Sequence, residues 1–252
     1  MSPGVGAGGI SVSAIAASFD QPFETARRHA NALIEDGFCE RRGLRIRMRR
    51  QVFERPAFQR LLGDLHDAMV RLIVALRAAG VPLPEPRDRD TYNPLATAAA
   101  AIDLTLAAYE YAGPHFDSWL QLRVFSAVFC ANGRAITTDA VLAATYAFVD
   151  TIPADDLLVP VTSSAVARVL NLSPATARRQ IRAALTSGML ARRGNGVVRT
   201  QAALDVMAEG GVMQASAQRA LKIIERLAPE GFRFDDPASH YLGPPPLLVD
   251  FS

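Results

Sequence analysis

The sequence has few of the residues and patterns that identify common binding sites. It contains only two cysteines, Cys39 and Cys130, far apart and outside any Cys-x-x-Cys pair, so neither a disulfide framework nor a zinc finger is expected. No run of about 18 apolar residues occurs, which argues against a membrane-spanning helix. A basic region followed by an apolar one is also missing at the start of the sequence, so we expect no secretory signal. These absences favour a cytoplasmic protein without a membrane partner.

Motifs for catalysis and for cofactor binding are missing as well. The four histidines are scattered along the chain, and no nucleotide-binding glycine loop or nucleophile elbow occurs. No pair of carboxylates suggests acid/base catalysis. We therefore expect no enzymatic activity, no cofactor and no bound metal.

The charged residues are distributed unevenly, although the net charge is only +2. Residues 1–86 carry 12 basic and 9 acidic side chains, net +3, and residues 161–252 carry 11 and 7, net +4. The segment 87–160 between them carries 4 basic and 9 acidic side chains, net −5. This split predicts that nucleic acid, if it is the partner, binds the two outer segments.

The strongest pattern in the sequence is an internal repeat with an offset of 151 residues. The letters Thr25-Ala26-Arg27-Arg28 recur as Thr176-Ala177-Arg178-Arg179. Residues 13–43 align on residues 164–194 without a gap, and 12 of these 31 positions are identical. The sequence therefore indicates a duplicated unit, of which we call 10–80 the first copy and 161–231 the second copy.

The second copy has the clearer sequence signals for where its helices and strands begin and end. A short helix is predicted over residues 163–170, and a second helix begins at Ser173-Pro174 and ends near Gly188. Asn195-Gly196 then predicts a tight turn between two short strands. In the first copy the corresponding helices cover residues 12–18 and about 21–36. There, Leu44, Ile46 and Met48 are expected to point to the core, and the arginines between them to the other face.

The order helix, turn, second helix, glycine and arginine-rich hairpin resembles the winged helix-turn-helix. The pattern is similar to that of bacterial regulators of the MarR and GntR type in Ser13-x-Ile15-Ala16, Thr25-Ala26-Arg27-Arg28 and Leu33-Ile34-Glu35-Asp36-Gly37-Phe38. The resemblance implies a mainly α fold with small β-wings, in which an all-helical segment joins two winged helix-turn-helix domains. A winged helix normally has a leading helix. Asp139–Asp150 is the candidate in the second copy, whereas in the first copy the helix is either missing or replaced by another part of the chain or by a partner subunit.

The predicted boundaries follow from this plan. Each winged helix includes a following apolar helix, over residues 57–79 and 216–227. The segments are a disordered N-terminus at 1–9, the first winged helix at 10–80, a linker at 81–94, a helical insert at 95–137, the second winged helix at 138–230 and an extended tail at 231–252.

In this architecture the second helix enters the major groove by its N-terminal half and the wing lies on the DNA backbone or in the minor groove. Arginine can bind guanine, asparagine adenine, and threonine a phosphate or a thymine methyl group. A carboxylate such as Glu24 opposes DNA binding unless it reads a cytosine amine. The predicted DNA-contacting residues are Thr25, Arg27, Arg28, Asn31, Arg41, Arg42, Arg45 and Arg47 in the first copy, and Thr176, Arg178, Arg179, Arg182, Arg192, Arg193 and Arg199 in the second.

We therefore expect a sequence-specific transcriptional regulator that binds double-stranded DNA through two non-identical winged helices. A replication initiator that binds origin repeats and a winged-helix adaptor that binds protein without DNA are the alternatives. A homodimer, formed through the apolar helices, and a small-molecule effector in the aromatic-rich helical insert remain open as partners.

Overall fold

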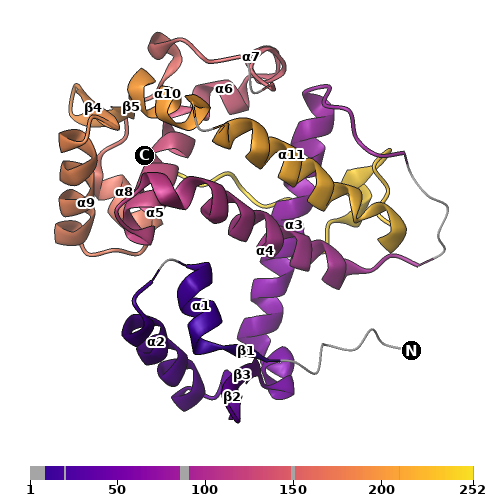
Figure 1. Ribbon diagram of the computed structural model, residues 1–252. Helices are drawn as coiled ribbons and strands as arrows, with labels where there is room; N and C mark the ends of the chain where they lie inside the picture. Colours follow the sequence, from indigo (N-terminus) through magenta and orange to yellow (C-terminus); the bar gives the residue numbers. More distant parts are fainter. Residues whose placement is uncertain (1–8, 20, 86–90, 149–150, 210, 252) are drawn as a thin grey trace. The chain divides into compact units, whose positions relative to one another are not determined.

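The computed structural model describes residues 9–19, 21–85, 91–148, 151–209 and 211–251 (Figure 1). The fold is mainly helical with small antiparallel sheets, as the sequence predicted. The chain divides into two compact units, Met1–Asp64 and Leu65–Ser252, each of which we describe by itself. In the described part of the chain, no helix has both the length and the apolar character that a bilayer crossing requires. The predicted disordered residues 1–8 lie outside the described residues.

The first unit contains the first copy of the repeat up to Asp64. Its three-stranded sheet has the order β1-β3-β2, and its core consists of Val12, Ala16, Ala26, Ala30 and Ile46. The elements are β1 (Ile10–Ser11), α1 (Val12–Ser18), α2 (Phe23–Glu35), β2 (Cys39–Arg42), β3 (Arg45–Met48), the 3-10 helix η1 (Arg50–Glu54) and the first residues of α3 (Pro56–Ala78).

The second unit contains the rest of α3, the helical insert and the second copy. Its helices before the repeat are α4 (Pro94–Ala112), α5 (Trp119–Asn132), α6 (Arg134–Thr138) and α7 (Ala140–Thr145), with the 3-10 helices η2 (Gly113–His115) and η3 (Asp155–Leu157). The second copy and the segments after it are α8 (Ser163–Val169), α9 (Pro174–Thr186), β4 (Leu190–Arg193), β5 (Gly196–Arg199), α10 (Gln201–Glu209), α11 (Val212–Glu225), η4 (Ala228–Glu230) and η5 (Pro237–His240).

The elements of the two copies share one register. Adding 151 to the bounds of α1, α2, β2 and β3 gives the bounds of α8, α9, β4 and β5. The strand pairing follows the same shift, because Ile10 opposes Ile46 and Val161 opposes Val197. The register therefore begins at a strand-pairing position that precedes the first identical residues of the repeat.

A glycine ends the second helix in both copies. Gly37 has a φ of 72° and Gly188 a φ of 76°, in the left-handed region that other residues rarely adopt. In the first copy, Arg55 donates from its guanidinium to the carbonyl oxygens of Asp36 and Gly37 and lies over the Phe38 ring. A cation at this end of α2 complements the negative end of the helix dipole.

Helix α5 packs where the winged-helix resemblance predicts a leading helix for the second copy. It packs on α8, α9 and β5, and its buried side chains Val124, Phe125 and Val128 belong to the same core as Ile181 and Ala184 of α9 (Figure 1). The prediction that Asp139–Asp150 forms this helix is wrong, because α7 stops at Thr145 and buries none of its residues. Residues 149 and 150 lie outside the described residues.

Asn132, the last residue of α5, fastens this helix to the hairpin. Its side-chain nitrogen donates to the carbonyl oxygens of Val159 and Val197, and its side-chain oxygen accepts from the backbone nitrogen of Arg199 at 2.8 Å. Because Asn132 is buried, these three bonds satisfy an amide that would otherwise destabilise the core.

The first unit leaves more of its second helix exposed. Ala30 is buried as its apolar spacing predicts, but Leu33 is 47% exposed, whereas its counterpart Ala184 is 1% exposed beneath α5. The predicted inward face of β3 is also partly wrong. Ile46 is buried, but Leu44 is 87% exposed because it lies in the turn before β3, and Met48 is half exposed at the end of that strand.

The remaining helices form a separate core in the second unit. Residues of α3, α4 and α11 pack together with Phe232 and Phe234. The side-chain carboxylate of Asp67 accepts from the backbone nitrogens of Leu242 and Gly243, and Arg71 donates to the carbonyl oxygens of Pro246 and Leu247. The predicted extended tail is therefore docked along α3.

Candidate nucleic-acid interface

Local sequence explains why α9 begins where it does. Ser173 is the N-cap, and its hydroxyl oxygen accepts from the backbone nitrogen of Thr176 at 3.2 Å. Pro174 occupies the first helical turn, where its missing N–H costs nothing. The hydroxyl of Ser173 also donates to Oγ1 of Thr176 at 2.8 Å, so Thr176 is held within the cap. The helix therefore starts rigidly at the end that the winged-helix resemblance assigns to the DNA.

The outward face of α9 is rich in arginine. Ala177, Ile181 and Ala184 point into the core, which leaves Arg178, Arg179 and Arg182 exposed. Among the described residues, these three arginines have no hydrogen bond and no ion pair. They are therefore free to bind an anion from outside the chain.

A groove lies between α9 and the hairpin of the second copy. It has a volume of about 250 Å³, and three arginines line it together with backbone and apolar atoms: Arg178, Arg182 and Arg192. Ser163 and Asn195 contribute polar atoms at its rim, and none of its lining residues is acidic. Three guanidiniums around one groove repel one another, so the bound state of an anion such as a phosphate is favoured there.

The equivalent helix of the first copy carries an internal ion pair. Glu24 lies one turn before Arg27, and Arg27 Nε donates to the Glu24 carboxylate at 2.7 Å. This hydrogen bond lowers the pKa of the Glu24 carboxyl and raises the pKa of Arg27. Arg28 is exposed and, within the described residues, forms neither a hydrogen bond nor an ion pair. Of the two predicted arginines on this helix, Arg27 is thus paired, and Arg28 has no hydrogen bond or ion pair to the residues that the structure describes.

The arginines of the β2–β3 hairpin in the first copy also have partners within the chain. Arg41 Nη2 donates to the side-chain oxygen of Asn31 at 3.0 Å, across the position where the second copy has its groove. Glu40 accepts from both Arg42 and Arg47, and the bond from Arg47 is the main cause of a lowered pKa of Glu40. The remaining predicted wing residue, Arg45, donates to the carbonyl oxygen of Gly9 at 2.9 Å. Thr25 is half-buried on the helix.

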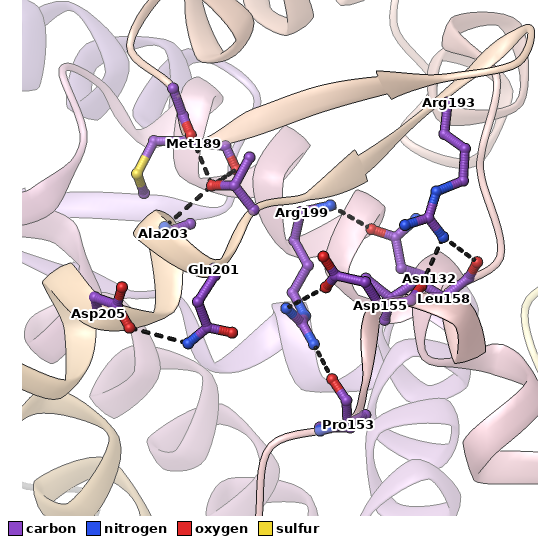
Figure 2. Close-up of polar contacts among 12 residues, drawn as sticks. Asn132, Pro153, Asp155, Leu158, Met189, Arg193, Arg199, Gln201, Ala203 and Asp205 are labelled. Carbon is purple, nitrogen blue, oxygen red and sulfur yellow. Dashed lines mark hydrogen bonds and ion pairs between the residues drawn. The ribbon is translucent and has the colours of Figure 1, made fainter.

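Two predicted DNA contacts of the second copy have structural partners instead. Arg199 is 3% exposed, and its Nη2 donates to the carbonyl oxygen of Pro153 at 2.9 Å, so it is not available at a DNA surface (Figure 2). Arg193 Nη1 donates to the carbonyl oxygens of Asp155 and Leu158 at 2.6 and 3.2 Å. Arg199 is removed from the candidate interface, and Arg193 is better placed to hold the loop before α8.

Sequence reasoning missed the acidic partner of the first hairpin, although a signal for it exists. With a turn at Gly43-Leu44, the strand register places Glu40 opposite Arg47. The burial of Arg199 also had a signal, because period two places it on the same face of β5 as the core residue Val197. The role of α5 had none, since apolar spacing shows that a helix is buried without showing what it covers.

In the described residues, no group of three or more His, Cys, Asp and Glu side chains is placed to hold a metal ion.

Comparison with known proteins gives no relative for this chain: neither a family model, nor a curated protein, nor a solved structure matches it.

Proposed function

We propose that this protein is a transcriptional regulator that binds specific sequences of double-stranded DNA through two unequal winged helix-turn-helix modules. In each module, α2 or α9 is the recognition helix and the following hairpin is the wing. The observation that carries the proposal is the face of unpartnered arginines on α9, namely Arg178, Arg179 and Arg182, beside Arg192 of the wing. Because the net charge of the chain is only +2, overall basicity does not explain this concentration of arginines on one face.

The position of these arginines suits the two kinds of contact that specific DNA binding needs. Arg179 and Arg182 lie on the outermost part of α9, where a side chain reaches base edges in the major groove and can bind O6 and N7 of guanine together. Arg178 and Arg192, which line the groove beside the wing together with Arg182, suit a backbone phosphate. Phosphate contacts set the position of a protein on the duplex and base contacts set the sequence.

We infer that the second copy supplies most of the binding energy. Its four exposed arginines have no partner in the described part of the chain, whereas Arg27, Arg42 and Arg47 of the first copy are paired with carboxylates. A paired arginine must give up or share its carboxylate before it binds a phosphate, so each such contact yields less. The first copy then contributes a weaker half-site, mainly through Arg28.

Fluorescence anisotropy with labelled genomic fragments tests the proposal directly. Affinity is expected to fall with ionic strength, with a log–log slope of about −0.9 for each phosphate neutralised. The variant Arg178→Ala/Arg179→Ala/Arg182→Ala should lose specific binding, while Lys222→Ala, an exposed cation on α11, serves as the control for loss of charge. No binding at low salt, or equal binding by the triple variant, would reject DNA as the partner and favour a protein-binding adaptor.

Genome-wide mapping of bound sites then identifies the process. Sites in promoters are the expected result for a transcriptional regulator. A single cluster of repeats at a replication origin would replace transcription with replication initiation as the function.

A further inference from the structure

A second cavity lies in the second unit at the end of β5, and its lining residues include no predicted DNA contact of α9. Its volume is about 300 Å³, and its walls are mainly apolar. The residues that form these walls include Phe129, Ile136, Tyr146, Phe148, Leu204 and Met213. Three aromatic rings among aliphatic side chains favour a flat apolar body over a sugar or a free ion.

Among the described residues that line this apolar cavity, one carries a charge, Arg199, and its hydrogen-bond donors are incompletely satisfied. Arg199 is 3% exposed and uses Nη2 to donate to the Pro153 carbonyl oxygen. Its Nη1 is buried and has no hydrogen-bond partner within the described residues, and it forms a long ion pair with Oδ1 of Asp155 at 3.8 Å (Figure 2). Burial lowers the pKa of Arg199, and the charge of Asp155 opposes this effect only in part.

A buried guanidinium with an unused donor is costly, and an anion that accepts from this donor would also compensate its charge. Asp155 does not complete it, because 3.8 Å is too long for a hydrogen bond and its side chain is 62% exposed to water. An exposed carboxylate at that position can move aside, which opens Nη1 to a carboxylate that arrives on a ligand. The surrounding walls would exclude water from that ion pair and strengthen it.

We propose that this cavity, which we call the Arg199 pocket, binds an organic carboxylate with a flat apolar body. The apolar body lies among Phe129, Tyr146 and Phe148, and the carboxylate accepts hydrogen bonds from Arg199. Two requirements select this ligand class. A neutral molecule leaves the charge of Arg199 uncompensated, and a small inorganic anion leaves the apolar walls unfilled.

The pocket is attached to the second module by covalent and hydrogen-bonded links. Arg199 is the last residue of β5, and Asn132 joins the backbone of Arg199 to the end of α5. An effect of the ligand on DNA binding rests on the proposed function, whereas ligand binding itself does not and is measured without DNA.

Isothermal titration calorimetry of the full chain with 2-naphthoate, and with 2-naphthamide as its neutral counterpart, tests the proposal. We expect 2-naphthoate to bind saturably and 2-naphthamide to bind at least about tenfold more weakly, because a charge-assisted hydrogen bond is lost. Arg199→Met should weaken 2-naphthoate by at least about tenfold and weaken 2-naphthamide less, because the amide oxygen accepts a hydrogen bond but carries no charge. Asp155→Asn should strengthen 2-naphthoate, and it preserves the bond from Arg193 because that bond uses the backbone oxygen of Asp155.

Three results would overturn the proposal: no saturable binding of 2-naphthoate, equal affinity for the acid and the amide, or unchanged affinity in Arg199→Met. If circular dichroism shows that Arg199→Met does not fold, Ile136→Trp replaces it. That variant fills the pocket and should abolish binding of both probes, and retained binding of 2-naphthoate would place the site elsewhere. Because no DNA is present, these outcomes are independent of whether the chain regulates transcription.

Discussion

The two copies of the repeat share a backbone register but differ in what surrounds their second helix. In the second copy, α5 covers the inner side of α9, and the outer side carries arginines that nothing in the described chain neutralises. In the first copy, Leu33 stays half exposed on α2, and carboxylates occupy Arg27, Arg42 and Arg47. A shared fold therefore does not imply a shared surface, and the difference arises from a few side chains.

The largest expected effect separates the recognition helices. Arg179→Ala/Arg182→Ala should weaken specific DNA binding by at least about 30-fold, since each base-reading arginine contributes about 1–3 kcal/mol. The equivalent change in the first copy, Arg28→Ala/Asn31→Ala, should cost less than about tenfold, because Asn31 already bonds to Arg41. Anisotropy titrations of both double variants on one DNA fragment measure the ratio. Equal losses would contradict the unequal modules.

The second expected effect concerns how tightly the inner sides of α9 and α2 are packed against other elements. Ala184→Leu places the first copy's residue beneath α5 and should lower the free energy of unfolding by about 1–3 kcal/mol through overpacking. The reciprocal Leu33→Ala acts on a half-exposed side chain and should cost less than about 1 kcal/mol. Urea unfolding of the two variants measures both values. A larger loss for Leu33→Ala would show that another surface covers α2 in solution.

A smaller effect compares the glycines that end the second helices. Gly37→Ala and Gly188→Ala each place a side chain at positive φ, which costs about 1–2 kcal/mol. At Gly37 a new Cβ would also lie 3.0 Å from Arg55 Nη2, whereas at Gly188 nothing lies within 4 Å. Thermal unfolding should therefore show a somewhat greater loss for Gly37→Ala. Equal losses would indicate that Arg55 moves away without cost, and a greater loss for Gly188→Ala would contradict the prediction.

The smallest effect removes an obstacle to DNA binding. Glu24→Ala gives the first copy the residue that the second has at Ala175, and it releases Arg27 from its ion pair. Affinity for DNA should rise by a few-fold, of the order of one added phosphate contact. Because the pKa of Glu24 lies below its usual value, lowering the pH from 7 to 5 should leave it charged and should not reproduce this gain. Weaker binding by Glu24→Ala would mean that the carboxylate itself reads a base.

The sequence was sufficient for the features that local chemistry determines. The N-cap Ser173, the stop at Gly188 and the long apolar spacing of α3 each predict a boundary from a few neighbouring residues, and the structure has these boundaries. The repeat register also follows from sequence alone, and it assigns corresponding residues to corresponding elements.

Features that depend on long-range contacts were beyond local patterns. Whether α5 or the segment 139–150 leads the second copy depends on which helix reaches α9, and both segments are apolar. The short helix α10 (Gln201–Glu209) was also missed, although Thr200 caps its start by accepting a hydrogen bond from the backbone nitrogen of Ala203 at 3.1 Å. The strand pattern predicted Arg193 and Arg199 as wing arginines. In the structure, they donate to carbonyl oxygens of the loop 153–158, which the alternation of residues along the strands could not predict.

The common register also has a practical consequence. From Ile10 to Met48 and from Val161 to Arg199 the elements correspond without an insertion or deletion, and Gly80 and Gly231 both keep a positive φ at the same offset. Every difference between the copies within this span is therefore a substitution. Segments can be exchanged between them residue for residue without rebuilding a loop, and such chimaeras can show whether DNA specificity moves with the transplanted helix.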